Sequence, residues 1–310
     1  MNQTDSQQPI TTLEAFLARR NGRSLSGSEV RGVDFAGFDF TGADLSGLRF
    51  VDVDLTAACL ARCVMRGTVI ADSPMLQADL SGADLQGADL TGSKLVTKKV
   101  VGADLRGAKI VQADLTGADL RQVKLQGATL ERCLMPGVNA EGVDFQKCVL
   151  MDSMFDKAKM SGARMTEVRA AQASFAGADL TRAVLVSMSA PCARFMDAVL
   201  DGANLDGAQL PGANFMRARV RQASLRGAKL SKTLWDHADV RSSKFDTADL
   251  SFADLSHAIA DLASFQKANL DRANLHRTSL ASTILSGANL QGVRKTDPDR
   301  AKAEDFKPGG

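Results

Sequence analysis

The chain of 310 residues contains no tyrosine, one tryptophan and three histidines, and aromatic residues make up only 5% of it. Its apolar residues are instead rich in alanine and leucine, so whatever core it forms has to be narrow. The formal net charge is +2 and the pI is near 8.3. This near-balance favours neither a dedicated nucleic-acid-binding protein nor an acidic mimic of nucleic acid.

Long apolar runs are also missing. No stretch of about eighteen apolar residues occurs, so no membrane-spanning helix is expected. The first residues, MNQTDSQQP, lack the basic region and apolar run of a secretory signal. The five cysteines, at positions 59, 63, 133, 148 and 192, follow neither a disulfide nor a metal-ligand spacing. We therefore expect a cytoplasmic protein.

What the chain has in abundance is a repeat of five residues, as in QADLSGADLQGADLTGSKL at 77–95. Every glycine before the terminal pair Gly309 and Gly310 occupies the same place in this repeat. Every fifth residue from Leu25 to Leu290 is apolar, and the residue two places before it is small, most often alanine. The register does not slip over this span, which excludes an inserted loop, a linker or a second domain inside it.

Each place in the repeat has its own chemistry. The leucine-type and alanine-type residues are apolar and are expected to point inward, while the other three point outward. Glycine at the last place suits a corner that needs a positive φ, as in a type II turn. A chain that turns in one sense after every five residues winds into a solenoid, whose coils stack at roughly 4.8 Å through backbone hydrogen bonds.

The triplets Ala43-Asp44-Leu45, Ala83-Asp84-Leu85 and Ala248-Asp249-Leu250 resemble the pentapeptide-repeat proteins, whose consensus is A-(D/N)-L-x-x. The resemblance implies an all-β solenoid, a right-handed quadrilateral β-helix with four pentapeptides in each of about thirteen coils. One internal sign agrees with twenty residues per coil, because a set of large aromatic residues would then stack as one ladder: Phe155, Phe175, Phe195, Phe215 and Trp235.

The two ends differ from the repeat. Residues 1–21 are predicted to hold a short N-terminal capping helix, with Thr11 and Glu14 as a capping box, an apolar face of Leu13, Phe16 and Leu17, and Gly22 as its end. The β-helix is expected over 22–294. Residues 295–310 form a charged tail, either a short helix that starts at Asp297-Pro298 and is anchored by Phe306, or a disordered segment.

Lys98 departs from the repeat because it stands in an inward alanine place. A buried ammonium group without a partner is costly. Two outcomes are open: the backbone bulges and Lys98 reaches solvent, or the edge of the solenoid opens locally. A bulge without function is the favoured interpretation.

The sequence contains no recognisable catalytic motif. A Gly-x-Ser-x-Gly motif cannot occur with glycines spaced by multiples of five, and no Gly-Lys-Ser/Thr follows the Gly-x-x-x-x-Gly pairs. The many aspartates are expected to bond backbone amides at corners, and Cys63, Cys133 and Cys148 to fill small inward places. His237 and His257 should stack on adjacent coils, with Arg217 and Arg277 completing the column, as a solvated ridge rather than an anion or pH-responsive site. We expect no enzyme, cofactor or metal.

A rod without a cleft acts through its surface, so we searched the outward places for apolar residues. They gather in one stripe, the candidate partner-binding site: Leu134, Pro136, Met154, Met196, Met216 and Leu234. A second candidate is a basic patch formed by Arg217, Arg219, Arg221 and Arg241. Several aspartates lie nearby in the sequence, so a mixed-charge surface is favoured over a site for an acidic protein or nucleic acid.

These observations favour a non-catalytic interaction scaffold of a bacterium that binds another protein and no nucleic acid. The resemblance is compatible with an accessory of a type VI secretion system. An alternative is a DNA-mimicking protein that protects DNA gyrase or another topoisomerase from quinolones, but Lys94, Lys99, Lys109 and Lys124 interrupt the aspartate rows that such a mimic needs. A further alternative is a secreted effector delivered into host cells.

Overall fold

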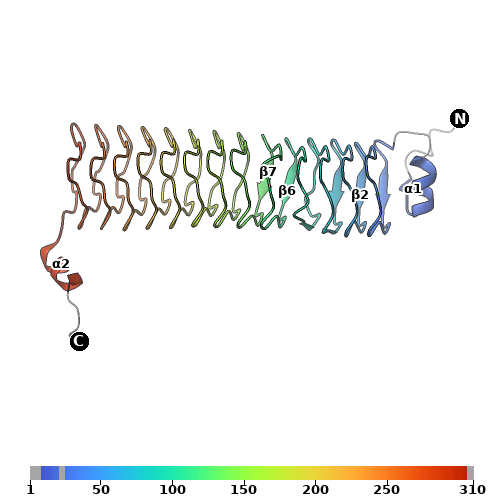
Figure 1. Cartoon of the computed structure of the whole chain (residues 1–310), viewed down its shortest axis with the longest axis horizontal. Helices are drawn as coiled ribbons and strands as arrows, with labels where there is room; N and C mark the ends of the chain where they lie inside the picture. Colours follow the sequence, from blue (N-terminus) through green and yellow to red (C-terminus); the bar gives the residue numbers. More distant parts are fainter. Residues whose placement is uncertain (1–7, 21–24, 306–310) are drawn as a thin grey trace. The chain divides into compact units, whose positions relative to one another are not determined.

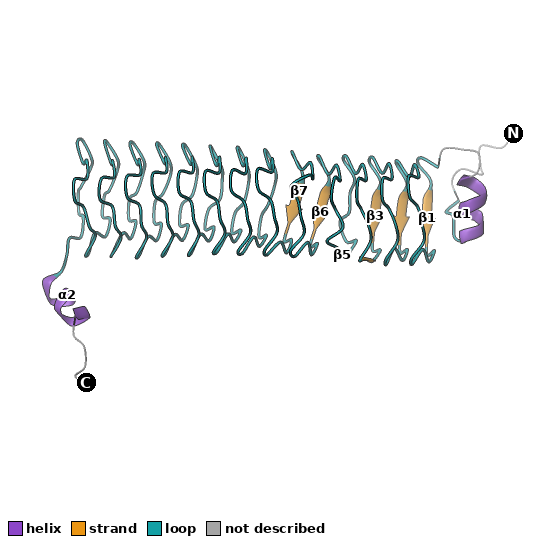
Figure 2. Ribbon diagram, viewed as in Figure 1, coloured by secondary structure: helices purple, strands orange, loops and turns teal. Residues whose placement is uncertain are grey.

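The computed structural model describes residues 8–20 and 25–305 and divides into two compact units, Met1–Lys159 and Met160–Gly310, each described here by itself. Helices and strands are short (Figure 2). Unit 1 holds helix α1 and all the named strands, and unit 2 holds helix α2. Their bounds are α1 Leu13–Arg20, β1 Glu29–Arg31, β2 Arg49–Val51, β3 Val69–Ala71, β4 Met75–Leu76, β5 Leu95–Val96, β6 Lys109–Val111, β7 Thr129–Glu131 and α2 Pro298–Asp305.

Both units are stacks of coils joined by parallel β-pairing (Figure 1). Apart from the segment around Lys98, the paired residues are twenty apart, as Asp34 is from Asp54 and Asn204 from Ser224. Most inward leucine-type residues donate their N–H to the carbonyl nineteen residues later, for example Phe35 N to Asp54 O at 2.8 Å. Since the repeat is five residues long, this pairing confirms four pentapeptides per coil. The backbone polar groups of the coils are thereby largely satisfied between neighbouring coils.

In unit 1 the inward places of the first coils carry phenylalanines that surround Phe16 of α1. The Phe16 side chain is fully buried, with its ring centroid 5.1 Å from that of Phe35 and 5.9 Å from that of Phe40. The predicted capping box is wrong by one residue, because the Ala15 N–H donates to the side chain of Thr12, not Thr11. The hydroxyl of Thr12 is the one that lies within reach of the first free N–H groups of the helix.

The inward places of unit 2 contain most of the predicted aromatic ladder. The rings of Phe175, Phe195, Phe215 and Trp235 stack in succession, with centroid separations of 5.1, 4.8 and 4.1 Å and interplanar angles below 10°. All four side chains are buried. Phe155, the first member of the predicted ladder, lies in unit 1, where its ring meets that of Phe145 edge to face. The twenty-residue spacing therefore predicted the stacking in unit 2.

The corners have the expected backbone. Gly162, for example, has a φ of +66°, and the same left-handed conformation recurs where the sequence has no glycine, as at Leu262 with φ +61°. Aspartate and asparagine side chains accept hydrogen bonds from the backbone two residues later, such as Ala36 N to Asp34 Oδ1 at 2.8 Å. The predicted reason for the recurring aspartates is therefore confirmed at many corners.

Leu262→Gly is expected to raise the free energy of unfolding by about 1 kcal/mol, because a left-handed φ is strained for any residue with a Cβ. The Leu262 side chain is 63% exposed, so little burial is lost. Gly162→Ala is the matched control: its added Cβ meets no atom within 4 Å, and the same strain should lower stability by a similar amount. Urea titrations followed by circular dichroism measure both. Shifts of the same sign in the two variants would contradict the prediction.

At Lys98 the coil pairing in unit 1 shifts by two residues. Val96 pairs with Asp114, eighteen residues on. The Thr97 N–H donates to the Asp114 carbonyl at 3.1 Å, in the place of Leu95, which would be the donor in a regular coil. Thr97 is buried and occupies the inward position, whereas Lys98 is exposed. The structure thus combines the two expected outcomes, because the backbone has shifted to turn Lys98 outward.

Unit 2 ends in α2, whose first turn is capped by Asp297, since the N–H groups of Asp299 and Arg300 donate to its Oδ1. Pro298 follows at the first helical position, where the missing N–H costs nothing. None of the residues of α2 is buried. The tail residue Phe306 and the predicted helix end Gly22 lie outside the described residues.

Candidate interaction site

The predicted partner-binding residues occur in both units. In unit 1, Leu134 and Met154 are directly paired on neighbouring coils, and the Leu134 side chain is 42% exposed. Pro136 and Met154 are half-buried. The carbonyl of Pro136 accepts a hydrogen bond from Gly117 N at 2.9 Å, so its backbone is tied into the ladder. Unit 1 therefore presents a small apolar patch on rigid backbone.

In unit 2, Met196 and Met216 lie on neighbouring coils, joined through the Asp197 N–H to Met216 O hydrogen bond of 3.0 Å. Leu234 is 40% exposed and pairs with Asn214 and Asp254. Met216 and Leu234 share the wall of a cavity of about 360 Å³ with residues that the sequence did not group with them, namely Asp236, His237, Asp254, Ser256, His257 and Arg300. The structure thus places part of the predicted site in a hollow lined by both apolar and polar side chains.

The histidine column in this hollow is confirmed, and its surroundings differ from the prediction. The rings of His237 and His257 stack at 4.7 Å. The sequence predicted a solvated ridge, whereas carboxylates flank the column in the structure: Asp236 lies 3.0 Å from His237 Nδ1, and Glu304 of α2 lies 3.5 Å from His257 Nε2. Glu304 was missed because it lies far along the chain and approaches only when α2 folds.

Glu304 also meets His276, whose side chain is almost fully buried, at 3.1 Å from its Nε2. The hydrogen bond from His276 lowers the pKa of Glu304 below its usual value. Arg277 adds a hydrogen bond to the Ala301 carbonyl and an ion pair with Asp305 at 2.5 Å. Together these contacts hold α2 against the last coils of unit 2.

His257, His276 and Glu304 bring three possible metal-ligand atoms within 4.8 Å of one another. However, Nδ1 of His276 accepts a hydrogen bond from the backbone N–H of Asp297 at 3.1 Å. The hydrogen of the ring therefore lies on Nε2, which donates a hydrogen bond to the Glu304 carboxylate. Metal binding through Nε2 would move that proton to Nδ1, where it would face another N–H. We assign no metal to this cluster.

Each arginine of the predicted basic patch has a carboxylate partner within unit 2. Arg217 pairs with Asp197 and Arg219 with Asp201, both at 2.7 Å, while Arg221 and Arg241 share Asp239. Burial alone would raise the pKa of Asp239, but the hydrogen bonds from Arg241 and Arg221 lower it to about 2. The patch is a network of alternating charges.

Two of the cysteines in the small inward places have thiols of strongly raised pKa. Cys133 and Cys148 are fully buried, and burial raises the pKa of Cys133 to about 11 and that of Cys148 to about 12. Their thiols point at backbone carbonyls, such as Cys148 Sγ to Leu125 O at 2.9 Å. Thiols of such high pKa are poor nucleophiles at neutral pH.

Unit 2 also has exposed apolar residues that were not predicted from the sequence. Phe252 is 46% exposed, with the Arg272 guanidinium 5.3 Å from its ring centroid, and Ile259 and Leu262 are also exposed. Phe252 and Leu262 stand at the corner place where glycine is usual. Large apolar residues at that place would have been the signal for them in the sequence.

Comparison with known protein families identifies the family to which this repeat belongs. The family described as pentapeptide repeats matches in eight copies, over residues 24–56, 48–86, 58–95, 101–135, 137–169, 193–231, 223–259 and 261–294. These segments span more than half of the chain. The chain belongs to the pentapeptide-repeat family. Its members fold as right-handed quadrilateral β-helices, and the twenty-residue coils of both units follow that architecture.

Solved structures of other pentapeptide-repeat proteins are similar to this chain. HetL, involved in heterocyst differentiation regulation in the cyanobacterium Nostoc sp. strain PCC 7120, is 24% identical over 63% of this chain and 90% of its own, with a TM-score of 0.41. A trypsin-treated R167E form of QnrB1, a plasmid-mediated fluoroquinolone resistance protein, is 19% identical over 63% and 95%, with a TM-score of 0.49. No curated protein matches the sequence.

Pentapeptide-repeat proteins are generally non-catalytic structural or binding proteins. Within the described part of this pentapeptide-repeat chain, no helix has the length and apolar character needed to cross a membrane. Its acidic rows are broken by basic side chains on adjoining coils of unit 1, as where Lys109 lies 3.8 Å from Asp89 and Lys124 3.6 Å from Asp104. A continuous acidic face is therefore absent from these rows.

Proposed function

We propose that this pentapeptide-repeat chain is a non-catalytic scaffold that binds a partner protein, and that unit 2 holds the principal docking site at Met196, Met216 and Leu234. The observation that carries the proposal is the cavity of about 360 Å³ to which Met216 and Leu234 contribute. Apolar side chains in a hollow with a polar rim are the usual composition of a protein-binding hot spot.

The site is held by rigid backbone. The Met216 N–H donates to Asn214 Oδ1 at 2.9 Å, and the Leu234 N–H donates to the Ala213 carbonyl at 3.0 Å. Methionine side chains on such a frame adapt to the shape of a partner while the backbone stays fixed. Binding then costs little ordering of the scaffold, which favours affinity.

The lining of this cavity carries both signs of charge. Asp236 and Asp254 line it together with Leu234, and so does Arg300 of α2. A partner that inserts an apolar side chain between these groups can form hydrogen bonds around it. We propose the patch of Leu134, Pro136 and Met154 in unit 1 as a second contact of the same kind.

The setting that we propose is the bacterial cytoplasm, with the scaffold as an accessory of a type VI secretion system. This setting is compatible with the family resemblance, while the docking site is supported by the cavity. The arginine residues of the basic patch are not part of the site, because their ion pairs with aspartates already neutralise them.

The test is a pull-down from bacterial lysate with the immobilised chain, followed by direct titration of the captured partner. Met196→Glu/Met216→Glu/Leu234→Glu should weaken its binding at least about tenfold, because carboxylates in an apolar contact must be desolvated. The matched control, Phe252→Glu/Ile259→Glu/Leu262→Glu, adds the same charge to exposed apolar residues of unit 2 outside the cavity lining, and should bind as the wild type does.

Equal loss in both variants, or in neither, would show that the cavity does not bind the partner and would overturn the proposed site. If the captured partner is DNA gyrase or another topoisomerase, the proposed cellular setting is wrong and topoisomerase protection takes its place. Circular dichroism of the three proteins checks that the substitutions leave the coils folded.

A further inference from the structure

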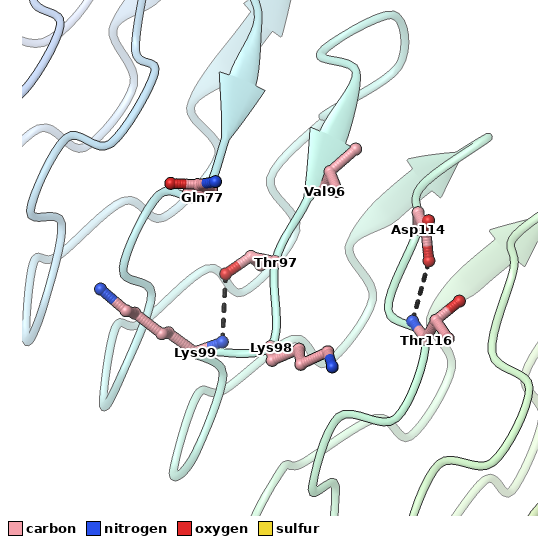
Figure 3. Close-up of a pocket in the computed structure, with 7 residues that line it drawn as sticks. All are labelled: Gln77, Val96, Thr97, Lys98, Lys99, Asp114 and Thr116. Atoms are coloured by element: carbon pink, nitrogen blue, oxygen red, sulfur yellow. Dashed lines mark hydrogen bonds between the residues drawn. The ribbon is translucent and has the colours of Figure 1, made fainter.

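The shifted corner at Lys98 in unit 1 builds a second hollow, which we call the Lys98 notch. It has a volume of about 340 Å³ and is lined by Gln77, Val96, Thr97, Lys98, Lys99, Asp114 and Thr116 (Figure 3). The volume lies in the range of small ligand sites. The notch exists because the coil extends by two residues here before it turns, so the usual corner is missing.

The side chain of Thr97 stabilises this local structure. Its hydroxyl donates to the Ala78 carbonyl at 2.7 Å and accepts the Lys99 N–H at 3.0 Å. In the regular coils these two backbone groups are bonded directly, as Asp79 N is to Ala58 O. The hydroxyl thus replaces a lost backbone pair, and the displaced register is a satisfied structure with its own hydrogen bonds.

The two lysines of the notch point in different directions in Figure 3. Lys98 reaches toward the next coil, where its Nζ lies 3.7 Å from the position that a Cβ on Gly117 would occupy. Lys99 extends toward the side of the preceding coil. The two ammonium groups are therefore separated along the direction in which the coils stack, and each is exposed to solvent.

The charge of the notch is predominantly positive. Among the described residues, neither Lys98 nor Lys99 has a carboxylate within 4.0 Å, whereas Lys109 and Lys124 of the same unit each have an aspartate partner. Residues 90–103 contain three lysines and no acidic residue. The one carboxylate in the lining is Asp114, and its Oδ1 accepts the Thr116 N–H at 2.9 Å. Two free cations thus outweigh one engaged anion.

Apolar surface adjoins these cations. Val96 in the lining is 40% exposed, and Leu76, which pairs with it on the preceding coil, is 41% exposed. A small inorganic anion would meet the ammonium groups but leave both apolar side chains in water. A peptide with acidic and branched apolar residues satisfies both features, because carboxylates can reach the lysines while an aliphatic side chain covers Val96.

We propose that the Lys98 notch binds an extended acidic segment of a partner protein, with carboxylates on Lys98 and Lys99 and an aliphatic side chain on Val96 and Leu76. This inference concerns unit 1 and stands independently of the cavity in unit 2. It also assigns a role to the interruption of the repeat: the shifted register turns outward a lysine that the regular coil would bury.

The experiment uses the full chain and a fluorescein-labelled twelve-residue peptide of alternating glutamate and valine, titrated by fluorescence anisotropy. A peptide with glutamine in place of glutamate, a glutamate–serine peptide and inorganic phosphate are the comparison ligands. Lys98→Gln/Lys99→Gln should weaken binding of the glutamate–valine peptide at least about tenfold, since it removes both cations. The matched control, Lys109→Gln/Lys124→Gln, removes the same charge from lysines that already have partners and should change binding less than about threefold.

A third variant tests the geometry separately from the charge. Thr97→Gly/Lys98→Ala restores the glycine and alanine of the regular repeat, so the coil should return to register, close the notch and lose binding while remaining folded by circular dichroism. The proposal is overturned if the wild type does not bind the glutamate–valine peptide at millimolar concentration or if the two glutamine variants lose binding equally. It is also overturned if phosphate or the glutamate–serine peptide binds as tightly.

Discussion

Phe215→Ala is expected to lower the free energy of unfolding by about 4 kcal/mol. The Phe215 ring is fully buried between two parallel rings, with centroids 4.8 Å from Phe195 and 4.1 Å from Trp235. The substitution removes a buried aromatic side chain and both stacking contacts. Alanine leaves a void that the neighbouring coils cannot close, because their spacing is set by the backbone ladder.

Trp235, the single tryptophan of the chain, reports on this site directly. Urea unfolding followed by its fluorescence and by circular dichroism should show an earlier transition in the variant. Phe252→Ala is the control, since its 46% exposed ring should cost less than about 1 kcal/mol. Equal losses of stability in the two variants would show that the ladder is not the stabilising core of unit 2.

Deleting residues 180–199 should leave unit 2 folded, whereas deleting 180–200 should abolish its folding. The shorter deletion removes one full coil, so Arg164, now paired with Val184, would pair with Asn204 instead. Phe175 would then stack on Phe215, and every inward residue would stay inward. The longer deletion removes one residue more than a full coil, so every later side chain moves to the neighbouring place in the repeat. Leucines would then face solvent, and polar residues would face the core.

Far-UV circular dichroism and thermal unfolding distinguish the two deletion variants. The 180–199 deletion should retain a cooperative transition with reduced enthalpy, because stability in a repeat protein is close to a sum over coils and their interfaces. The 180–200 deletion should lack a transition from unit 2 while that of unit 1 remains. Similar unfolding curves for the two variants would show that the fold of unit 2 does not depend on a strict register.

The helix caps and corners show which structural features can be predicted from the local sequence. The corner aspartates and the positive φ at the glycine place were predictable because both depend on residues within one pentapeptide. The start of α1 was displaced by one residue, from Thr11 to Thr12, because adjacent threonines offer the same hydroxyl and only the path of the chain selects between them. Local chemistry therefore predicted the kind of each feature more reliably than its position.

The candidate sites depend on contacts that a repeat pattern does not contain. Met216 and Leu234 were predicted from exposed places in the coil, but their cavity also needs Arg300 from α2. Glu304 meets His276 across twenty-eight residues. The sequence favoured a mixed-charge surface at the basic patch but did not give the individual ion pairs, such as that of Arg221 with Asp239 on the adjoining coil, because side-chain direction sets them.

The sequence by itself determined the solenoid and its inward places, because a five-residue pattern that stays in register puts the same two residues of each repeat inside. The twenty-residue coil was implied by the family resemblance and agreed with the spacing of the aromatic residues, since a period of five does not fix the number of sides. The tertiary structure decided how Lys98 leaves the core, how α2 lies against the last coils and which charged side chains remain without partners. These features arise from long side chains and altered hydrogen bonds between neighbouring coils. Which of these contacts form depends on the distances between side chains on neighbouring coils, and those distances exist only in the folded solenoid.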